Sequence, residues 1–271
     1  MILFDTHCHL TDPAFAEDAA GVYERARAAG VEGIAVCGYD AASNEAALAF
    51  AEGREGVFPT VGFHPHEAGT VTPGMLADLD ALAALPAVAA VGELGLDFYR
   101  DHSTPADQRR VLDAQLEIAL RHGKPVSFHS RAAEDAAGEH LAPFARLMAE
   151  RWPGRVPGVM HCFQGTVDQA RRYVALGFLV SIACPITYPR NDENRAMARE
   201  LPAESLVIET DSPYLPPQKL RGTRNEPANV KAAAAAIAEA RGISLEDVAT
   251  LTTRNAERLY RVAIRAGVHA A

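Results

Sequence analysis

The chain has 271 residues, of which 48% are hydrophobic, and this is enough for one barrel-sized domain with a large core. Its formal net charge of −9 argues against a broad electrostatic grip on duplex DNA, because such binding depends on many cation–phosphate contacts. The sequence has no run of about eighteen apolar residues and no basic N-terminal leader, so we expect no membrane span and no secretory signal.

The four cysteines form no Cys-x-x-Cys pair, and this spacing favours free thiols in a reducing compartment. We therefore expect a cytoplasmic protein. Nothing in the sequence indicates an obligate protein partner.

Short apolar segments typical of buried strands recur along the chain. The first begins with Ile2–Phe4 and leads directly into the polar residues around His7 and His9. The later predicted strands are Val31–Cys37, Val57–Phe63, Ala87–Glu93, Pro125–His129, Val156–Cys162, Phe178–Ala183 and Leu206–Asp211.

Segments with helical patterns separate these strands. The first opens at the pair Asp12–Pro13, which is typical of a helix cap and first turn, and we expect it to run to about Gly30. Another ends near Glu150, and we expect a break in it at Pro143. The other predicted helices are Ser43–Glu52, Met75–Leu85, Thr104–Gly123, Val167–Leu176, Asp192–Glu200, Pro227–Arg241 and Leu245–Val262.

Strand and helix alternate eight times, which predicts an α/β fold of parallel βαβ units closed into a (β/α)8 TIM barrel. We expect a single domain over residues 1–271. An open doubly wound sheet is the alternative, although no Gly-x-Gly-x-x-Gly follows a predicted strand.

Two histidines one strand-step apart lie at the end of the first predicted strand. Because side chains alternate along a strand, we expect Asp5, His7 and His9 on one face. Two neutral imidazoles in this arrangement can hold one divalent ion. Asp5 is expected to orient an imidazole rather than to bind the ion itself.

Further candidate ligands follow the carboxyl ends of other predicted strands, which is where a barrel of this kind carries its chemistry. Any one of these side chains alone could serve only to bind loop backbone. Together they predict a metal site, because carboxylates buried there without a cation would be costly. The six candidates are His7, His9, Glu93, His129, His161 and Asp211.

Four imidazoles and two carboxylates suit two divalent ions, and the mixed nitrogen and oxygen set favours Zn²⁺ or Mn²⁺, whereas Mg²⁺ prefers oxygen. Glu93 is expected to bridge the ions, since each carboxylate oxygen can bind one of them. Ions about 3.5–4 Å apart can activate water for an in-line displacement at phosphorus. One ion would be held by His7, His9, Glu93 and Asp211, and the other by Glu93, His129 and His161.

Several blocks of the sequence together carry a specific pattern. They are Phe4–Leu10, Gly62–His66, Gly92–Asp97, Pro125–Asp135, Leu201–Pro213 and Arg221–Pro227. These blocks resemble the TatD family of metal-dependent hydrolases, and the resemblance covers nearly the whole chain. It implies a metallo-dependent hydrolase TIM barrel with a two-metal site at the six residues above. It also implies deoxyribonuclease activity, often from the 3′ end, with single-stranded DNA or 3′ ends as the substrate.

Other residues are candidates for catalysis or substrate binding. The resemblance implies that His64 faces the site and holds the scissile phosphate or the water, and a plain surface turn is the alternative. With Glu93 and His64, Asp211 is expected to be catalytic, because it could orient the water or take its proton. Glu209 is expected to orient an imidazole, like Asp5. Candidates for phosphate contacts, if they do more than solvate loops, are Arg131, Arg221, Arg224 and Asn225.

The sequence leaves two other functions open. An amidohydrolase could cut a small cyclic amide, lactone or ester, because fold alone does not decide between these chemistries. Many such enzymes use a carbamylated lysine as the bridge, but Lys124 lies ~16 Å of extended strand from His129 at about 3.3 Å per residue. A non-catalytic scaffold is the other alternative, and the complete ligand set argues against it.

Overall fold

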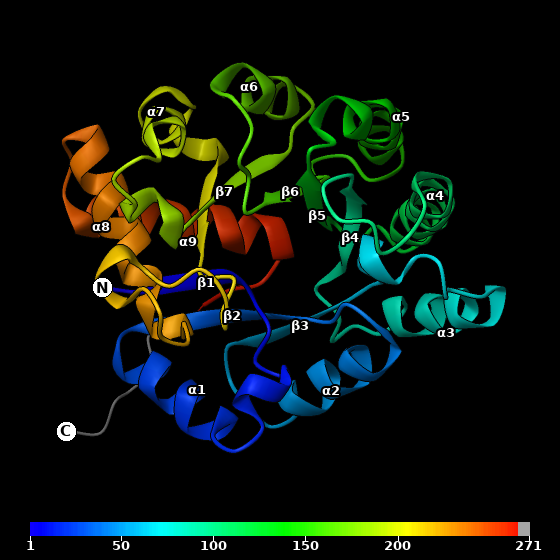
Figure 1. The fold of residues 1–271 in the computed structure, drawn as a ribbon, viewed down its shortest axis with the longest axis horizontal. Helices are drawn as coiled ribbons and strands as arrows, with labels where there is room; N and C mark the ends of the chain where they lie inside the picture. The colour runs from blue at the N-terminus through cyan, green and yellow to red at the C-terminus, as the bar shows by residue number, and fades with distance from the viewer. Residues whose placement is uncertain (265–271) are drawn as a thin grey trace.

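The computed structural model describes residues 1–264, and these form eight parallel strands surrounded by helices (Figure 1). Neighbouring strands pair in chain order from the first to the eighth. The predicted domain extends to residue 271, and residues 265–271 lie outside the described part. The strands are β1 Leu3–Cys8, β2 Val31–Cys37, β3 Val57–Val61, β4 Ala90–Asp97, β5 Val126–Arg131, β6 Gly158–His161, β7 Leu179–Ala183 and β8 Leu206–Glu209.

The sheet closes where the carboxyl ends of β1 and β8 meet. The Asp211 amide donates to the His7 carbonyl at 2.9 Å, and the His9 amide donates to the Ser212 carbonyl at 2.7 Å. Cys8 and Ser212 form an isolated parallel bridge beside these bonds. The predicted TIM barrel is therefore confirmed, and the open doubly wound sheet is excluded.

Nine α-helices are present in residues 1–264, and α1 to α8 follow the strands around the outside of the barrel (Figure 1). None of them is both long and apolar enough to cross a membrane. The helices are α1 Ala19–Ala28, α2 Ala41–Ala51, α3 Pro73–Ala83, α4 Pro105–His122, α5 Glu134–Arg151, α6 Val167–Ala175, α7 Asp192–Glu200, α8 Val230–Arg241 and α9 Leu245–Tyr260.

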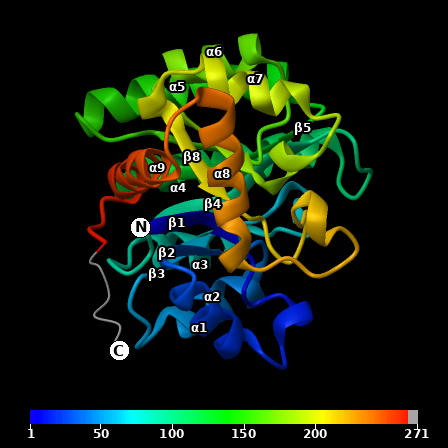
Figure 2. The same cartoon turned by 90° about the vertical axis from the view of Figure 1, so that its left-hand side faces the viewer.

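The ninth helix lies on the side where β1 begins (Figure 2). Its Tyr260 hydroxyl donates to the Thr6 carbonyl at 2.7 Å, and its ring stacks on Phe4 with centroids 5.6 Å apart. Apolar residues of β1, β2, β4, β6, β7 and β8 pack with α9 in one cluster. This helix therefore covers the amino-terminal mouth of the barrel and leaves the carboxyl-terminal mouth open for chemistry.

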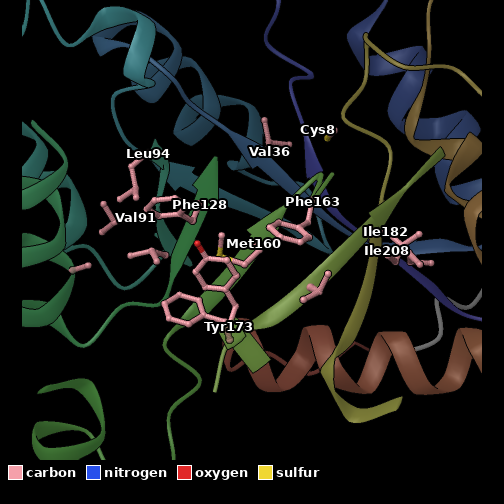
Figure 3. Packing of buried hydrophobic residues seen from close by; sticks show 14 of the residues in the cluster. Cys8, Val36, Val91, Leu94, Phe128, Met160, Phe163, Tyr173, Ile182 and Ile208 are labelled. Atoms are coloured by element: carbon pink, nitrogen blue, oxygen red, sulfur yellow. The ribbon is translucent and has the colours of Figure 1, made fainter. Parts of the chain in front are cut away.

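A second, larger apolar cluster joins the strands to the surrounding helices. In it, Leu94, Phe128 and Met160 come from the adjacent strands β4, β5 and β6 (Figure 3). Phe128 and Met160 are completely buried. This packing fixes the strands that carry the polar residues described below.

The first predicted helix is interrupted. Asp12 does cap a turn, since its carboxylate accepts the Ala14 amide at 2.8 Å, but the turn is a short 3₁₀ segment over Pro13–Phe15. The backbone of Asp18 then has a φ of −142°, which no α-helix accommodates, and α1 begins only after it. The carboxylate of Asp18 binds Arg224, so a distant side chain stabilises a break that local pattern does not reveal.

The expected break at Pro143 is absent, because α5 continues through that residue. A proline removes the hydrogen bond to the carbonyl four residues earlier, here Glu139. Both Pro143 and Glu139 are exposed, so water can reach that carbonyl and the helix continues.

The fourth strand begins later and ends later than predicted, so Glu93 lies in its middle and not at its end. Its pairing with β5 is irregular between Val91 and Leu94 and then continues to Asp97. Gly95 has a φ of +149°, and a Cβ there would lie 1.9 Å from the His129 carbonyl oxygen. Glycine at this position therefore permits the close approach of β4 to β5 beside Glu93.

Candidate metal centre

The six predicted ligands converge at the carboxyl-terminal mouth of the barrel. The cavity there has a volume of about 470 Å³. Five of the six line it, and His7 lies behind them, completely buried. Its walls also include Tyr39, His64, His66, Glu67, Arg100, Arg131 and Tyr214.

The carboxylate of Glu93 stands between two sets of imidazoles. Its Oε2 atom lies 3.5 Å from Nε2 of both His7 and His9. Its Oε1 atom lies 3.0 Å from His129 Nδ1 and 3.6 Å from His161 Nε2. Each oxygen of one carboxylate therefore faces a different group of ring nitrogens.

The outer Nδ1 atoms of His7 and His9 contact neighbouring oxygens, and their Nε2 atoms therefore point into the centre. His9 Nδ1 lies 3.0 Å from the Cys37 carbonyl, which can only accept, so the ring proton is on Nδ1 and Nε2 carries a lone pair. His7 Nδ1 lies 3.1 Å from Ser127 Oγ. The two Nε2 atoms are 3.2 Å apart, an arrangement that a cation between or beside them would stabilise.

The other two rings are held by carboxylates. His161 Nδ1 lies 2.8 Å from Glu209 Oε1, and His129 Nε2 lies 3.2 Å from Asp97 Oδ2. Each outer nitrogen is thereby the protonated one, and the inner nitrogen of a neutral ring would point its lone pair at Glu93. Lone pairs directed at a carboxylate fit divalent cations, so the donor set suits a metal centre.

The side chain of Asp211 lies beside the set formed by His7 and His9. Its Oδ1 atom lies 3.6 Å from His9 Nε2 and 3.9 Å from His161 Nε2. The residue has a φ of +56°, a left-handed conformation that aspartate tolerates better than most residues. The side chain is 14% exposed, so it borders the cavity directly.

His64 also faces Glu93, with its Nε2 atom 3.5 Å from Oε1, but it differs from the other rings. The His66 amide donates to His64 Nδ1 at 3.1 Å, which leaves the proton of the neutral ring on Nε2. Burial lowers the pKa of His64 to about 3, against the opposing effect of Glu93, so the ring is neutral at pH 7. His64 therefore presents a hydrogen-bond donor to the cavity.

The carboxylates and imidazoles of the centre shift each other's pKa values against the effect of burial. Burial alone would raise the pKa of Glu93, but the surrounding histidines, led by His64 and His161, hold it well below its ordinary value. Burial would likewise lower the pKa of His161, but Glu209 and the other carboxylates raise it to about 10. The carboxylates therefore favour positive charge at these rings, which bound cations would supply in place of protons.

Asp5 is expected from the sequence to orient an imidazole, but its carboxylate binds Thr210. Its carboxylate accepts the Thr210 amide at 2.8 Å and the Thr210 hydroxyl at 2.6 Å. The pairing of β1 is irregular between Asp5 and Cys8, so strict alternation fails there. Thr6 reaches Ser181 of β7 while His7 reaches Ser127 of β5, so two consecutive side chains both point into the barrel.

Two expected phosphate contacts have structural partners instead. Asn225 is completely buried, and its amide donates to the carbonyls of Thr210 and Tyr214 at 3.0 and 2.8 Å. The guanidinium of Arg224 binds Asp18 at 2.7 Å. Both side chains hold the loop after β8. Asn225 has no exposed surface for a substrate, whereas the Arg224 side chain is 31% exposed.

The remaining two arginines lie in different places. Arg131 ends β5, is exposed and lines the cavity. Arg221 is exposed but does not line it, and its guanidinium lies over the Tyr188 ring at 4.8 Å.

Sequence reasoning missed Asp97 as a member of the site. The residue is buried, and its Oδ2 atom lies 2.9 Å from His66 Nε2 and 3.2 Å from His129 Nε2. A signal was available, because Asp97 is a carboxylate at the end of a long apolar segment, as Asp211 is.

The barrel and the converging histidines and carboxylates define the class of metal-dependent hydrolases with a TIM-barrel fold. The sequence model of the TatD-related DNase family matches residues 4–261. The chain belongs to this family of hydrolases, as its sequence blocks predicted.

Similar proteins match along their full length. The chain is 36% identical to "Uncharacterized metal-dependent hydrolase YabD" of Bacillus subtilis, with 96% of this chain and 100% of that protein covered. It is 37% identical to "3'-5' ssDNA/RNA exonuclease TatD" of Edwardsiella piscicida, with the same coverage. Its fold matches the crystal structure of YJJV, a TatD homologue from Escherichia coli, with a TM-score of 0.89, 33% identity and coverage of 96% and 98%.

Proposed function

We propose that the protein is a metal-dependent exonuclease that hydrolyses phosphodiester bonds at the 3′ end of single-stranded DNA or RNA. The observation that carries this proposal is the carboxylate of Glu93, whose two oxygens each face a separate set of histidine nitrogens. The names of similar proteins, among them an exonuclease of single-stranded DNA and RNA, support the same chemistry.

The proposed cofactors are two divalent ions, with Zn²⁺ or Mn²⁺ favoured by the nitrogen-rich donors and Mg²⁺ as the alternative. Glu93 would contribute one oxygen to each. The other ligands are proposed as His7, His9 and Asp211 for one ion and as His129 and His161 for the second. The histidines are grouped by their distances to Oε2 and Oε1 of Glu93. Asp211 is placed with His9, because its Oδ1 atom lies 3.6 Å from His9 Nε2.

When bound, the ions would supply the positive charge that lowers the pKa of a water molecule and stabilises charge on the phosphate. The chain's own groups have the remaining roles. Asp211, at the border of the cavity, orients the attacking water or takes its proton. His64 donates from Nε2 to a phosphate oxygen or to the water, and Arg131 binds phosphate from the rim.

The amidohydrolase alternative lacks its bridging lysine here. Lys124 donates to the Leu85 carbonyl at 3.1 Å and to the Val88 carbonyl at 2.5 Å. It precedes β5 and lines a separate cavity with Val57, the first residue of β3, at the amino-terminal mouth. A glutamate bridge therefore favours the nuclease.

We also propose a cytoplasmic location. All four cysteines, Cys8, Cys37, Cys162 and Cys184, are free thiols in the structure. This state is typical of a reducing compartment.

The test is a substrate panel with purified protein reconstituted with Zn²⁺, Mn²⁺ or Mg²⁺. End-labelled single-stranded DNA, duplex DNA and RNA are compared with lactones, esters and cyclic amides, and Glu93→Ala protein purified in the same way controls for contaminating nucleases. We expect stepwise shortening of single strands from the 3′ end, lost in Glu93→Ala. Turnover of a lactone or amide without cleavage of any nucleic acid would overturn the proposal.

A further inference from the structure

The cavity over the metal centre is too small for more than about one nucleotide. Its volume is about 470 Å³, near the lower end of the range of small-ligand pockets. A nucleic acid strand with its terminal phosphodiester at Glu93 must therefore place its next nucleotides outside the cavity, across the rim. The rim is therefore where the protein would contact an unpaired base.

The turn after β4 places an aromatic ring on that rim. Tyr99 is 63% exposed, and its hydroxyl has no hydrogen-bond partner among residues 1–264. The guanidinium carbon of Arg131, which lines the cavity, lies 4.1 Å from the centre of the Tyr99 ring. Arg100, which also lines the cavity, lies 5.4 Å from the same ring centre. The ring is thus held by contacts with two cations and keeps most of its surface open.

The position of this ring is fixed relative to the metal centre by one carboxylate. Asp97 Oδ1 accepts the backbone amides of Tyr99 and Arg100, each at 2.9 Å. The other oxygen, Oδ2, lies 3.2 Å from Nε2 of His129. The ring and the second set of ligands are therefore tied to opposite sides of the same side chain.

The charges around the ring suit a nucleotide. Neither Arg100 nor Arg131 forms an ion pair with any carboxylate of residues 1–264. The two arginines share the cavity wall with histidines, two tyrosines and acids such as Glu67, and their guanidinium groups stay positively charged at any ordinary pH. A base stacked on an aromatic ring with guanidinium groups near its phosphate is a common arrangement in proteins that bind single strands.

We propose that Tyr99, supported by Arg131, is a stacking subsite for the nucleobase next to the phosphodiester at the metal centre. The proposal rests on the proposed nuclease function and extends it, because it makes an unpaired base part of substrate recognition. A base paired in a duplex has both faces covered by its neighbours and cannot stack on Tyr99.

The test measures binding without turnover, by fluorescence anisotropy of a labelled oligothymidylate with metal-free protein. Wild type, Tyr99→Ala and Tyr99→Phe are compared on the intact strand and on strands with one abasic site at each position near the 3′ end in turn. We expect Tyr99→Ala to weaken binding of the intact strand about tenfold and Tyr99→Phe to leave it within about twofold. At one position, the abasic site should weaken wild-type binding by the same factor, with no further loss in Tyr99→Ala.

Three results would overturn the stacking subsite, and a fourth would overturn only the nuclease proposal. Equal weakening of intact and abasic strands at every position by Tyr99→Ala would show an indirect effect of the turn and overturn the subsite. So would unchanged binding of the intact strand, or no binding by wild type. If base-dependent binding is found but no strand is cleaved after metal is added, the nuclease proposal fails and the stacking subsite stands.

Discussion

Asp97 Oδ2 lies 3.2 Å from Nε2 of His129, on the side of the ring opposite to Glu93. The imidazole is thereby held between two carboxylates. This contact sets which nitrogen carries the proton and therefore which one faces the proposed metal centre. The neighbouring His66 binds the same oxygen of Asp97 at 2.9 Å.

Replacing Asp97 with asparagine should weaken the second proposed metal site. An amide can still accept the backbone amides of the turn through Oδ1, but its NH₂ group would then face His129 and His66. We expect the affinity for one of the two ions to fall by about 10–100-fold, the usual effect of losing a carboxylate behind a ligating histidine. Competition with a chromogenic chelator measures this affinity, and Asp101→Asn, an exposed acid in the same loop, is the matched control. Equal affinities in both variants would contradict the role given to Asp97.

Substitution of Asp211 by asparagine should affect turnover more than substrate binding. The amide cannot accept a proton from the attacking water, whereas it preserves the size of the side chain. We expect kcat on single-stranded DNA to fall by about 10²–10⁴-fold, with KM changed far less. Steady-state kinetics with saturating metal tests this, with Asp168→Asn on the exposed surface of α6 as control. A proportionate loss of kcat and of substrate affinity would argue against a role in the transition state.

Asn225 should matter for stability and not for substrate binding. Substitution by alanine would remove the donors to Thr210 and Tyr214 and leave their carbonyls unpaired in a buried loop. We expect the free energy of unfolding to fall by about 2–4 kcal/mol, and Arg221→Ala to change it by less than about 0.5 kcal/mol. Urea denaturation measures both. A raised KM for Asn225→Ala with unchanged stability would restore the original expectation of a phosphate contact.

Much of the barrel can be predicted from sequence because its buried strands are short apolar runs bounded by turn residues. The six candidate ligands are visible for a related reason. Each is a histidine or acid in or directly after such a run, and the carboxyl ends of parallel strands meet at one mouth. Glu93 could be identified as a candidate even though its strand was placed several residues too early, because its side chain still reaches that mouth.

The remaining differences arise from contacts between segments far apart in the chain. The irregular pairing of β1 turns the successive side chains of Thr6 and His7 inward, and Asp5 binds Thr210 instead of an imidazole. The break before α1 depends on the pair between Asp18 and Arg224. The proton on His64 is set by a backbone amide two residues later. Composition and periodicity carry no information about such contacts.

Glu93 is proposed to hold two cations, one at each carboxylate oxygen. The most direct measurement is an anomalous-scattering map of crystals grown with Zn²⁺ or Mn²⁺, together with the metal content of the same protein. We predict two peaks, one beside His7 and His9 and one beside His129 and His161, and the loss of at least one ion in Glu93→Ala. A single peak or none at saturating metal, or two ions retained in Glu93→Ala, would contradict it.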